Sequence, residues 1–334
     1  MKEPITCSLT GHQWWKPFLG FLVLSVVIMV PLQTASNSMS EITDLRILLS
    51  SFSFILVLSV LLTLVQAAFT ITLSRVALPL IAFRGKQFSF NGSAGEYVSL
   101  HLVCILLSLI TFGFYLPWYY TRTMQYYVSH VSYDGEAAKF EGKPGKLMKY
   151  YVLGLILPLL VLFIVFGVLI STAIMYQVNN YPEIAETLFL TIGALNIVIF
   201  ILIIPFMYYL YKWFINISWK NLRFYWKTEF WGSFFFLTGQ LLLSLVTLGI
   251  YLPAAILAIY KYFIDRTVID RDGQPAGRFE FARERGGFAF LWGQILLSIV
   301  TVGIYLPWAY ANILRYVLSH VTVDETPAEL PQNY

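Results

Sequence analysis

Near its C-terminal end the chain reads TVGIYLPW, Thr301–Trp308, and this motif decides the fold that the sequence predicts. Related motifs occur twice more, as TFGFYLPW at Thr111–Trp118 and TLGIYLPA at Thr247–Ala254. Glycine gives the backbone conformational freedom, whereas proline removes an amide donor and disfavours helix in the residue before it. Each motif therefore predicts a bend within an apolar run. The expected hairpin breaks are Gly113, Pro117, Gly249, Pro253, Gly303 and Pro307.

The composition is that of a membrane protein. The 334 residues are 58% hydrophobic and 12% charged, which leaves too little polar surface to coat a water-soluble globule of this size. A hydrocarbon core of about 30 Å needs roughly 20 apolar residues in a helix. Longer runs that lack Asp, Glu, Lys and Arg lie at Ile47–Ser74, Tyr150–Gln177, Thr187–Tyr211, Phe230–Tyr260 and Gly286–Leu314.

The predicted fold class is an all-α polytopic membrane protein, built from helical hairpin repeats with short cytoplasmic β-hairpins. Conventional transmembrane pairs are expected at about 17–33 with 46–73 and at about 149–176 with 187–212. The run Phe18–Leu32 resembles a secretory signal, but no small-residue cleavage site follows it, so we expect an uncleaved span. The expected segments are a first helix pair (1–83), hairpin repeat 1 (84–145), a second helix pair (146–222), hairpin repeat 2 (223–277), and hairpin repeat 3 with an acidic tail (278–334).

Alternation with a period of two predicts short strands beside the hairpins. It occurs in KQFSF from Lys86, VSYDGEAAKF from Val131, TVIDRDGQPAGRFEF from Thr267 and VTVDETP from Val321. Asp-Gly pairs in the second and third of these stretches favour tight hairpin turns. The fourth stretch is expected to end without a return strand.

The distribution of Lys and Arg predicts the topology, because short cytoplasmic loops are enriched in these residues. The loops 33–45 and 177–186 contain neither, so we place both outside and both termini in the cytoplasm. Basic residues flank every hairpin repeat, which therefore returns to the side it came from. A leg of 15 residues reaches only about 22 Å, so the turns either reach the far face or end within the membrane. In an alternative arrangement the second legs lie flat on the surface as amphipathic helices.

Polar residues recur along the second legs at helical spacing, which predicts one wet helix face. Together with polar residues of the first legs they are candidates for a polar path or ligand contact: Arg122, Gln125, Lys261, Asn312, Arg315, His101, Gln240 and Gln294. His130, Arg266 and His320 share one repeat position, where they either contact a lipid phosphate or cap the second leg. His101 and the glutamines could equally form hydrogen bonds between helices.

The sequence offers no argument for an enzyme. Cys7 and Cys104 are its only cysteines and no histidine pair has metal-ligand spacing, so we expect no disulfide framework, metal or cofactor. The formal charge of +4 is small and scattered, which argues against nucleic acid as a partner. Expected partners are membrane lipids and a protein at the cytoplasmic face.

Two functions fit these features. Short segments interrupted by glycine and proline at corresponding repeat positions favour transport of a small or anionic solute through a polar path. The alternative is a membrane-organising scaffold, whose hairpins enter the inner leaflet and whose β elements form a cytoplasmic platform.

The order of these motifs resembles the YjgN family of bacterial inner-membrane proteins, a family with a domain of unknown function. The matching stretches are Phe88–Gly92, Leu109–Trp118, Tyr126–Tyr127 and Asp134–Gly142. The second copy departs from the motif at Ala254, and the third lacks the closing hairpin. The resemblance implies a multi-pass protein of the bacterial inner membrane and supplies no catalytic residues.

Overall fold

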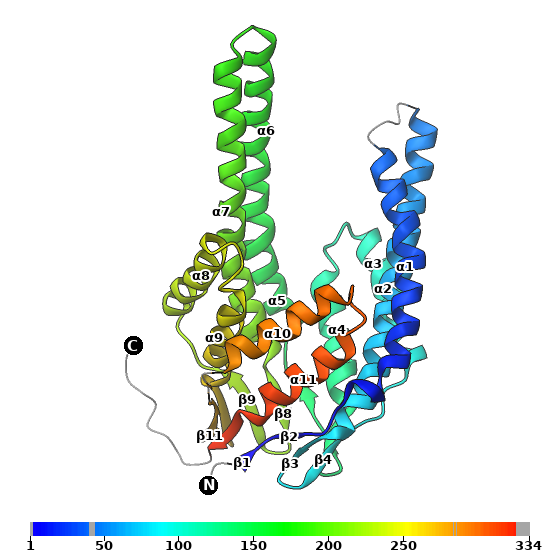
Figure 1. Ribbon diagram of the computed structural model, residues 1–334, viewed down its shortest axis with the longest axis vertical. Helices are drawn as coiled ribbons and strands as arrows, with labels where there is room; N and C mark the ends of the chain where they lie inside the picture. The colour runs from blue at the N-terminus through cyan, green and yellow to red at the C-terminus, as the bar shows by residue number, and fades with distance from the viewer. Residues whose placement is uncertain (1–2, 40–43, 283, 285, 325–334) are drawn as a thin grey trace.

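The structure is a computed structural model that describes residues 3–39, 44–282, 284 and 286–324 (Figure 1). Helices in antiparallel pairs stand on a base of antiparallel strands, and two of the pairs are much longer than the rest (Figure 1). The predicted acidic tail and Arg283 and Arg285 lie outside the described residues. The strand base, which holds the paired first and last strands at Glu3–Pro4 and Val321–Asp324, lies opposite the tips of the long helix pairs (Figure 1).

Two long helix pairs lie where the conventional pairs were expected. The first consists of α1 (Trp15–Ser38) and α2 (Leu45–Ala77). The second consists of α5 (Pro144–Tyr151), a π-helical turn η4 (Val152–Ile156), α6 (Leu157–Val178) and α7 (Pro182–Phe214). Trp15–Ser38, Leu45–Leu80 and Pro144–Val178 are long and apolar enough to cross a membrane.

Each of the three motifs lies between two short helices, as predicted. These pairs are α3 (Ala94–Ile110) with α4 (Leu116–Ser129), α8 (Phe230–Val246) with α9 (Leu252–Ile264), and α10 (Gly287–Val300) with α11 (Leu306–Ser319). The second leg returns to the start of the first, because the Tyr126 hydroxyl donates to the Ser93 carbonyl and the Ser233 and Tyr262 hydroxyls share a hydrogen bond.

The turn motif pairs its own backbone N–H groups with acceptors inside the hairpin. In the third copy, every N–H from Thr301 to Leu306 donates to an acceptor within the hairpin. Gly303 has φ +85°, and its N–H donates to the Ser298 carbonyl at 2.8 Å. The Thr301 hydroxyl donates to Leu297 and accepts the N–H of Tyr305 at 3.1 Å. The other two turns contain the same bonds, which explains the recurring Thr, Gly and Pro.

The strands form two antiparallel sheets in the orders β1-β12-β11-β10-β9-β8-β7 and β2-β3-β4-β5-β6. Their bounds are β1 Glu3–Pro4, β2 Thr6–Cys7, β3 Ile81–Phe83, β4 Lys86–Phe90, β5 Val131–Tyr133, β6 Glu136–Ala137, β7 Lys139–Phe140, β8 Ile217–Trp219, β9 Leu222–Trp226, β10 Thr267–Arg271, β11 Gln274–Phe281 and β12 Val321–Asp324.

The two sheets join into one closed strand order. Only Ile5 separates β1 from β2, and only Ala138 separates β6 from β7. The Ile5 N–H donates to the Val321 carbonyl at 3.2 Å, and the Ala138 N–H donates to the Val131 carbonyl at 3.0 Å, so pairing continues at both interruptions. We call this closed arrangement of β1 to β12 the strand ring. A closed order leaves no unpaired sheet edge.

One backbone hydrogen bond recurs at five places around the strand ring. In each, the N–H just after a strand donates to the carbonyl of the residue that ends a helix pair. The bonds are Ser8 to Leu80 (2.9 Å), Asn91 to His130 (3.2 Å), Glu141 to Asn216 (2.9 Å), Lys227 to Arg266 (3.0 Å) and Ala282 to His320 (2.9 Å). Every helix pair, long or short, is thus attached to the ring in the same way.

The predicted β-hairpins are present, but the prediction of separate short hairpins was incomplete. The sequence analysis missed the β8–β9 hairpin and the N-terminal strand. β12 was expected to lack a partner strand from its own repeat, and it pairs instead with β11 and with β1, at Pro4–Thr322. The chain ends therefore supply the pairing that closes the ring.

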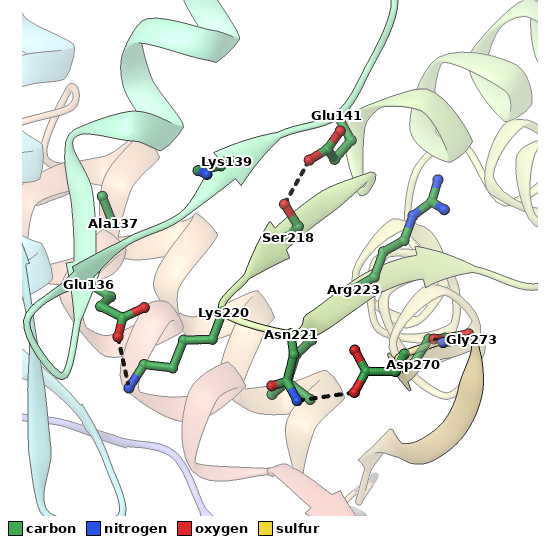
Figure 2. A pocket seen from close by; sticks show the side chains of 12 residues that line it. Glu136, Ala137, Lys139, Glu141, Ser218, Lys220, Asn221, Arg223, Asp270 and Gly273 are labelled. Atoms are coloured by element: carbon green, nitrogen blue, oxygen red, sulfur yellow. Dashed lines mark hydrogen bonds and ion pairs between the residues drawn. The ribbon is translucent and has the colours of Figure 1, made fainter.

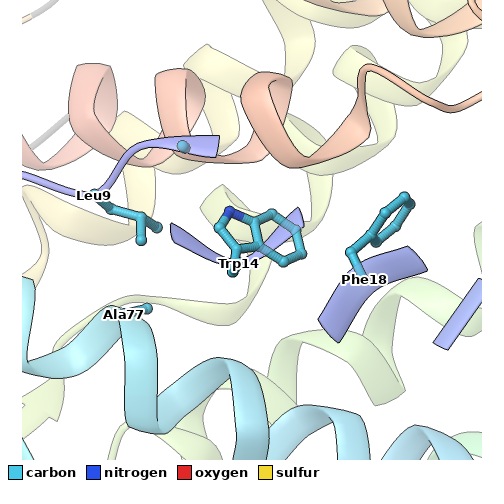
Figure 3. Packing of buried hydrophobic residues seen from close by; sticks show 5 residues of the cluster. Leu9, Trp14, Phe18 and Ala77 are labelled. Atoms are coloured by element: carbon cyan, nitrogen blue, oxygen red, sulfur yellow. The ribbon is translucent and has the colours of Figure 1, made fainter. Parts of the chain in front are cut away.

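A hydrophobic cluster holds the N-terminal segment in place above the strands. Leu9, Trp14 and Phe18 pack with Ala77 of α2 and Ala311 of α11 (Figure 3). Leu9 and Ala311 are fully buried. This packing joins the first and last helix pairs, just as the pairing of β1 with β12 joins the first and last strands.

We predict that Gly249→Ala destabilises the protein by about 1–2 kcal/mol, because Gly249 has φ +86° and an L-residue is strained there. Gly239→Ala in α8 is the matched control, since a methyl group has open space at both positions and alanine favours helix by about 0.5–1 kcal/mol. Thermal unfolding in detergent, followed by circular dichroism, measures both. Equal effects of the two variants would contradict the assigned turn conformation.

Candidate functional site

A polar cleft of about 520 Å³ lies on the strand ring (Figure 2). Five strands, β6 to β10, and their turns supply the charged and polar lining: Glu136, Lys139, Glu141, Ser218, Lys220, Asn221, Arg223, Asp270 and Asp272. The strand register brings polar side chains together in the cleft, because Lys139 pairs with Ser218, Ser218 pairs with Arg223, and Arg223 pairs with Asp270. Residues paired across a sheet point to the same face, so the four side chains form one polar row.

The opposite face of the same strands is apolar and meets the helices. Phe140 pairs with Ile217, and Phe140 packs with Val128, Leu147 and Trp213 from three helices. Alternation along a strand sends neighbouring residues to opposite faces. The helices therefore fix the strands from one side, and the polar row faces away from them.

The cleft is organised by contacts among its own residues. The Ser218 hydroxyl donates to Glu141 at 2.8 Å, and the Asn221 amide donates to Asp272 at 3.4 Å (Figure 2). Lys220 Nζ lies 3.5 Å from Glu136 (Figure 2). Acidic and basic groups are mixed, so the cleft suits a polar surface with both charges better than a simple anion or cation.

Ion pairs also link neighbouring hairpin turns. Lys86 Nζ lies 2.6 Å from Asp134, which also lies 3.5 Å from Lys220. The hydrogen bond with Lys86 lowers the pKa of the Asp134 carboxyl and raises the pKa of the Lys86 ammonium. These groups are exposed, so the pairs fix the relative positions of turns more than they stabilise the fold.

The predicted polar path residues of the third hairpin bond to one another. Gln294 Oε1 accepts from the Tyr305 hydroxyl at 3.2 Å and from the Asn312 amide at 3.1 Å. Asn312 Oδ1 accepts from Arg315 at 2.5 Å. This chain of bonds joins the two legs and the turn of one hairpin.

The second hairpin keeps the Tyr–Gln bond of the third and replaces the Asn312–Arg315 pair, whereas the first hairpin has other contacts. In the second, the Tyr251 hydroxyl donates to Gln240 at 3.1 Å, and Lys261 donates to Asp265 at 2.7 Å and to the Phe281 carbonyl at 2.9 Å. In the first, the Arg122 guanidinium lies 5.7 Å from the Tyr115 ring centre. His101 bonds the Tyr97 carbonyl of its own helix at 2.9 Å, and Gln125 is exposed.

His130, Arg266 and His320 each lie over a tyrosine four residues earlier. Ring centres are 4.1 Å apart for His130 and Tyr126 and 4.4 Å apart for His320 and Tyr316, and Arg266 lies 3.8 Å from the Tyr262 ring centre. Both histidines also bond the carbonyl four residues back through Nδ1. This geometry matches the capping alternative, and it leaves lipid-phosphate contact a prediction.

A second groove, of about 560 Å³, lies beside the third hairpin. It brings Asn312, Arg315 and Ser319 of the predicted polar stripe against Phe290 and the N-terminal strand. Across the residues that the structure describes, no group of three or more His, Cys, Asp or Glu side chains is placed to hold a metal ion.

Sequence reasoning missed the polar cleft. The stretch ISWKNLRFYW, residues 217–226, alternates polar and apolar residues around Lys-Asn, and that alternation could have indicated a hairpin. The pairing of Lys139 with Ser218 could not be predicted from the sequence, because a long helix pair separates these residues along the chain.

A family model described as "Bacterial protein of unknown function (DUF898)" matches residues 85–270 and 276–330. No curated protein and no solved structure matches the chain. The family match covers most of the chain and agrees with the resemblance noted from the turn motifs.

We predict that Gln294→Leu destabilises the protein by about 1–3 kcal/mol, because it breaks two hydrogen bonds, leaves the Tyr305 hydroxyl without its acceptor and leaves Asn312 with the Tyr305 hydroxyl as acceptor. Gln240→Leu, at the matching position of the second hairpin, removes a single bond and should cost about 0.5–1.5 kcal/mol. Thermal unfolding in detergent compares the two. A larger loss for Gln240→Leu would count against the third-hairpin network.

Proposed function

Since the chain belongs to the DUF898 family of bacterial proteins of unknown function, its role has to be argued from its own geometry, and we propose that it is a non-enzymatic scaffold of the bacterial inner membrane. The two long helix pairs span the membrane. The strand ring then lies at the cytoplasmic face and presents the polar cleft to a protein partner.

The charge distribution and the chain ends support this orientation. The segments 33–45 and 177–186, which contain the connections between the long helices, lack Lys and Arg, whereas the ring contains many basic residues. Pairing of β1 with β12 places the first and last described strands together on the ring side. A multi-pass chain with both termini in the cytoplasm fits both observations.

The polar cleft is the observation that carries the scaffold proposal. It lies on paired strands whose other face is fixed by three helices, so its shape is held before a partner binds. Preorganised surfaces lose less conformational entropy on binding. Its mixed charges favour recognition by a protein surface with complementary charges.

The polar residues of the hairpins give less support to a transport path. Gln240, Gln294, Asn312 and Lys261 bond to neighbours inside their own hairpins. Residues held in such pairs fix helix packing, which is the common role of polar side chains between membrane helices.

Transport is the second candidate, and the groove beside the third hairpin favours it. Arg315 is exposed there and lies near Asn312 and Ser319, so an anionic group of a small solute would meet a guanidinium and two neutral donors. Such a solute would pass between the third hairpin and the N-terminal strand.

We predict that a photo-crosslinking amino acid at Lys139 or Arg223, both in the cleft, captures one defined protein partner in intact cells. The full-length protein is used, and the adduct is identified by mass spectrometry. Position Gln87 is the matched control, because it is exposed on β4 and lies outside the cleft. Adducts should form at the two cleft positions and be absent at the control.

Two results would contradict the scaffold role. One is the same set of adducts at all three positions, which indicates random contact. The other is the absence of adducts together with solute flux in reconstituted vesicles that is lost in Arg315→Leu. The second result would support transport in its place.

A further inference from the structure

The three hairpin turns present bare apolar tips. Phe112, Leu248 and Val302 occupy the same position in the three motifs, and their exposed fractions are 94%, 92% and 87%. All three have φ +50°, which directs the residue outward at the top of the turn. Large apolar residues at the most exposed points of a fold mark a surface that is covered by another protein or by a membrane.

The backbone N–H groups at these tips need no water. Each N–H of the turn has an acceptor within the hairpin, and Pro117, Pro253 and Pro307 have no N–H to satisfy. Non-helical backbone is excluded from hydrocarbon chiefly because its polar groups would go unpaired. These turns meet most of that requirement through their own bonds.

The apolar surface continues down the first hairpin. Leu102, Val103, Leu106 and Ile110 of α3 are exposed, whereas the first turn of the helix contains Glu96. Large apolar residues of α2 are likewise exposed between Ile47 and Leu61. The hairpin and the long helix pair thus both expose large apolar side chains.

The packing of α3 against α2 sets the depth of the tip. Tyr97 and Ile71 belong to one buried cluster, which places them at the same level. Phe112 lies fifteen residues beyond Tyr97, about 22 Å higher at 1.5 Å per residue, level with Leu56 of α2. Leu45, at the far end of α2, lies about 16 Å higher still. Half of a hydrocarbon core is about 15 Å, so the tip reaches the middle of a bilayer that α2 spans.

We propose that the three turns insert into the hydrocarbon of the cytoplasmic leaflet and end near the bilayer midplane, where lipid acyl chains cover them. Figure 1 shows α3 ending well below the far end of the α1–α2 pair, in agreement with this depth. The inference rests on the proposed membrane position and adds lipid as a second partner. Three turns that insert from one side displace lipid from the cytoplasmic leaflet only.

The test uses the full-length protein with Cys7→Ser and Cys104→Ala, reconstituted in vesicles of phosphatidylethanolamine and phosphatidylglycerol. Phe112→Cys, Leu248→Cys and Val302→Cys are each labelled with an environment-sensitive fluorophore. The vesicles contain lipids with a nitroxide quencher either near the headgroup or near the acyl-chain end. Leu56→Cys is the matched midplane control, and Gly85→Cys, in the β3–β4 turn, is the water control.

We predict that the acyl-chain-end quencher is the more effective one at all three tips, as at Leu56→Cys. The tips should also resist an impermeant maleimide added from either side. Labelling of the tips from the periplasmic side would overturn the proposal, as would quenching like that of Gly85→Cys. Protection from both maleimide and lipid quenchers would indicate a protein cover and would equally overturn it.

A separate position distinguishes this failure from failure of the proposed function. Tyr181→Cys, between α6 and α7, should react with periplasmic maleimide if the long pairs span the membrane. Reaction at Tyr181→Cys, together with tips that lie in water, would overturn the proposed insertion of the turns. It would leave the proposed scaffold role unaffected. No reaction at Tyr181→Cys from the periplasm would overturn both.

Discussion

The pairing of the N-terminal strand with both β12 and β3 is the constraint on which the rest of the structure depends. Ten short stretches of chain, each too small to be stable alone, become a closed ring only when this strand is in place. Closure removes free edges and fixes where each helix pair begins and ends. The five recurring hydrogen bonds, from Ser8–Leu80 to Ala282–His320, then attach every pair to the ring in the same way. The polar cleft and the positions at which the helix pairs leave the ring both follow from that attachment.

The turn motif solves a separate problem, which is how to reverse a chain without water. Thr301 supplies both a donor and an acceptor, Gly303 adopts the left-handed conformation, and Pro307 removes one N–H. In each hairpin this motif pairs every turn N–H with an acceptor of the hairpin itself, which explains why the same residues recur three times. The interrupted apolar run of the sequence and the exposed apolar tips of the structure thus have one cause. The ring positions the hairpins, and the turns let them end in an apolar medium.

The helical part of this fold could be predicted from the sequence because its signals are local. Bends at Gly113, Gly249 and Gly303 and the bounds of the long pairs follow from spacing and apolar length alone. The strand ring could not be predicted, because β1 and β12 come from opposite ends of the chain and each contains four residues or fewer. The same difference between local signals and contacts of distant segments applies to the candidate site. Gln294 and Asn312 were recognised as unusual polar residues in apolar legs, yet their common partner Tyr305 requires knowledge of how the legs meet. Lys139 and Ser218 meet only through ring closure.

Closure of the strand ring is the central claim, and a disulfide at the β1–β12 pair tests it most directly. Pro4 and Thr322 are register partners, so Pro4→Cys with Thr322→Cys, in a background with Cys7→Ser and Cys104→Ala, should form an intramolecular disulfide on mild oxidation. Pro4→Cys with Val321→Cys is the control, because a shift of one residue directs the side chain to the other face. The account predicts a disulfide in the first variant and little in the second, measured by mass spectrometry of the intact protein. Absence of the disulfide in the first, or equal formation in both, would contradict the closed ring.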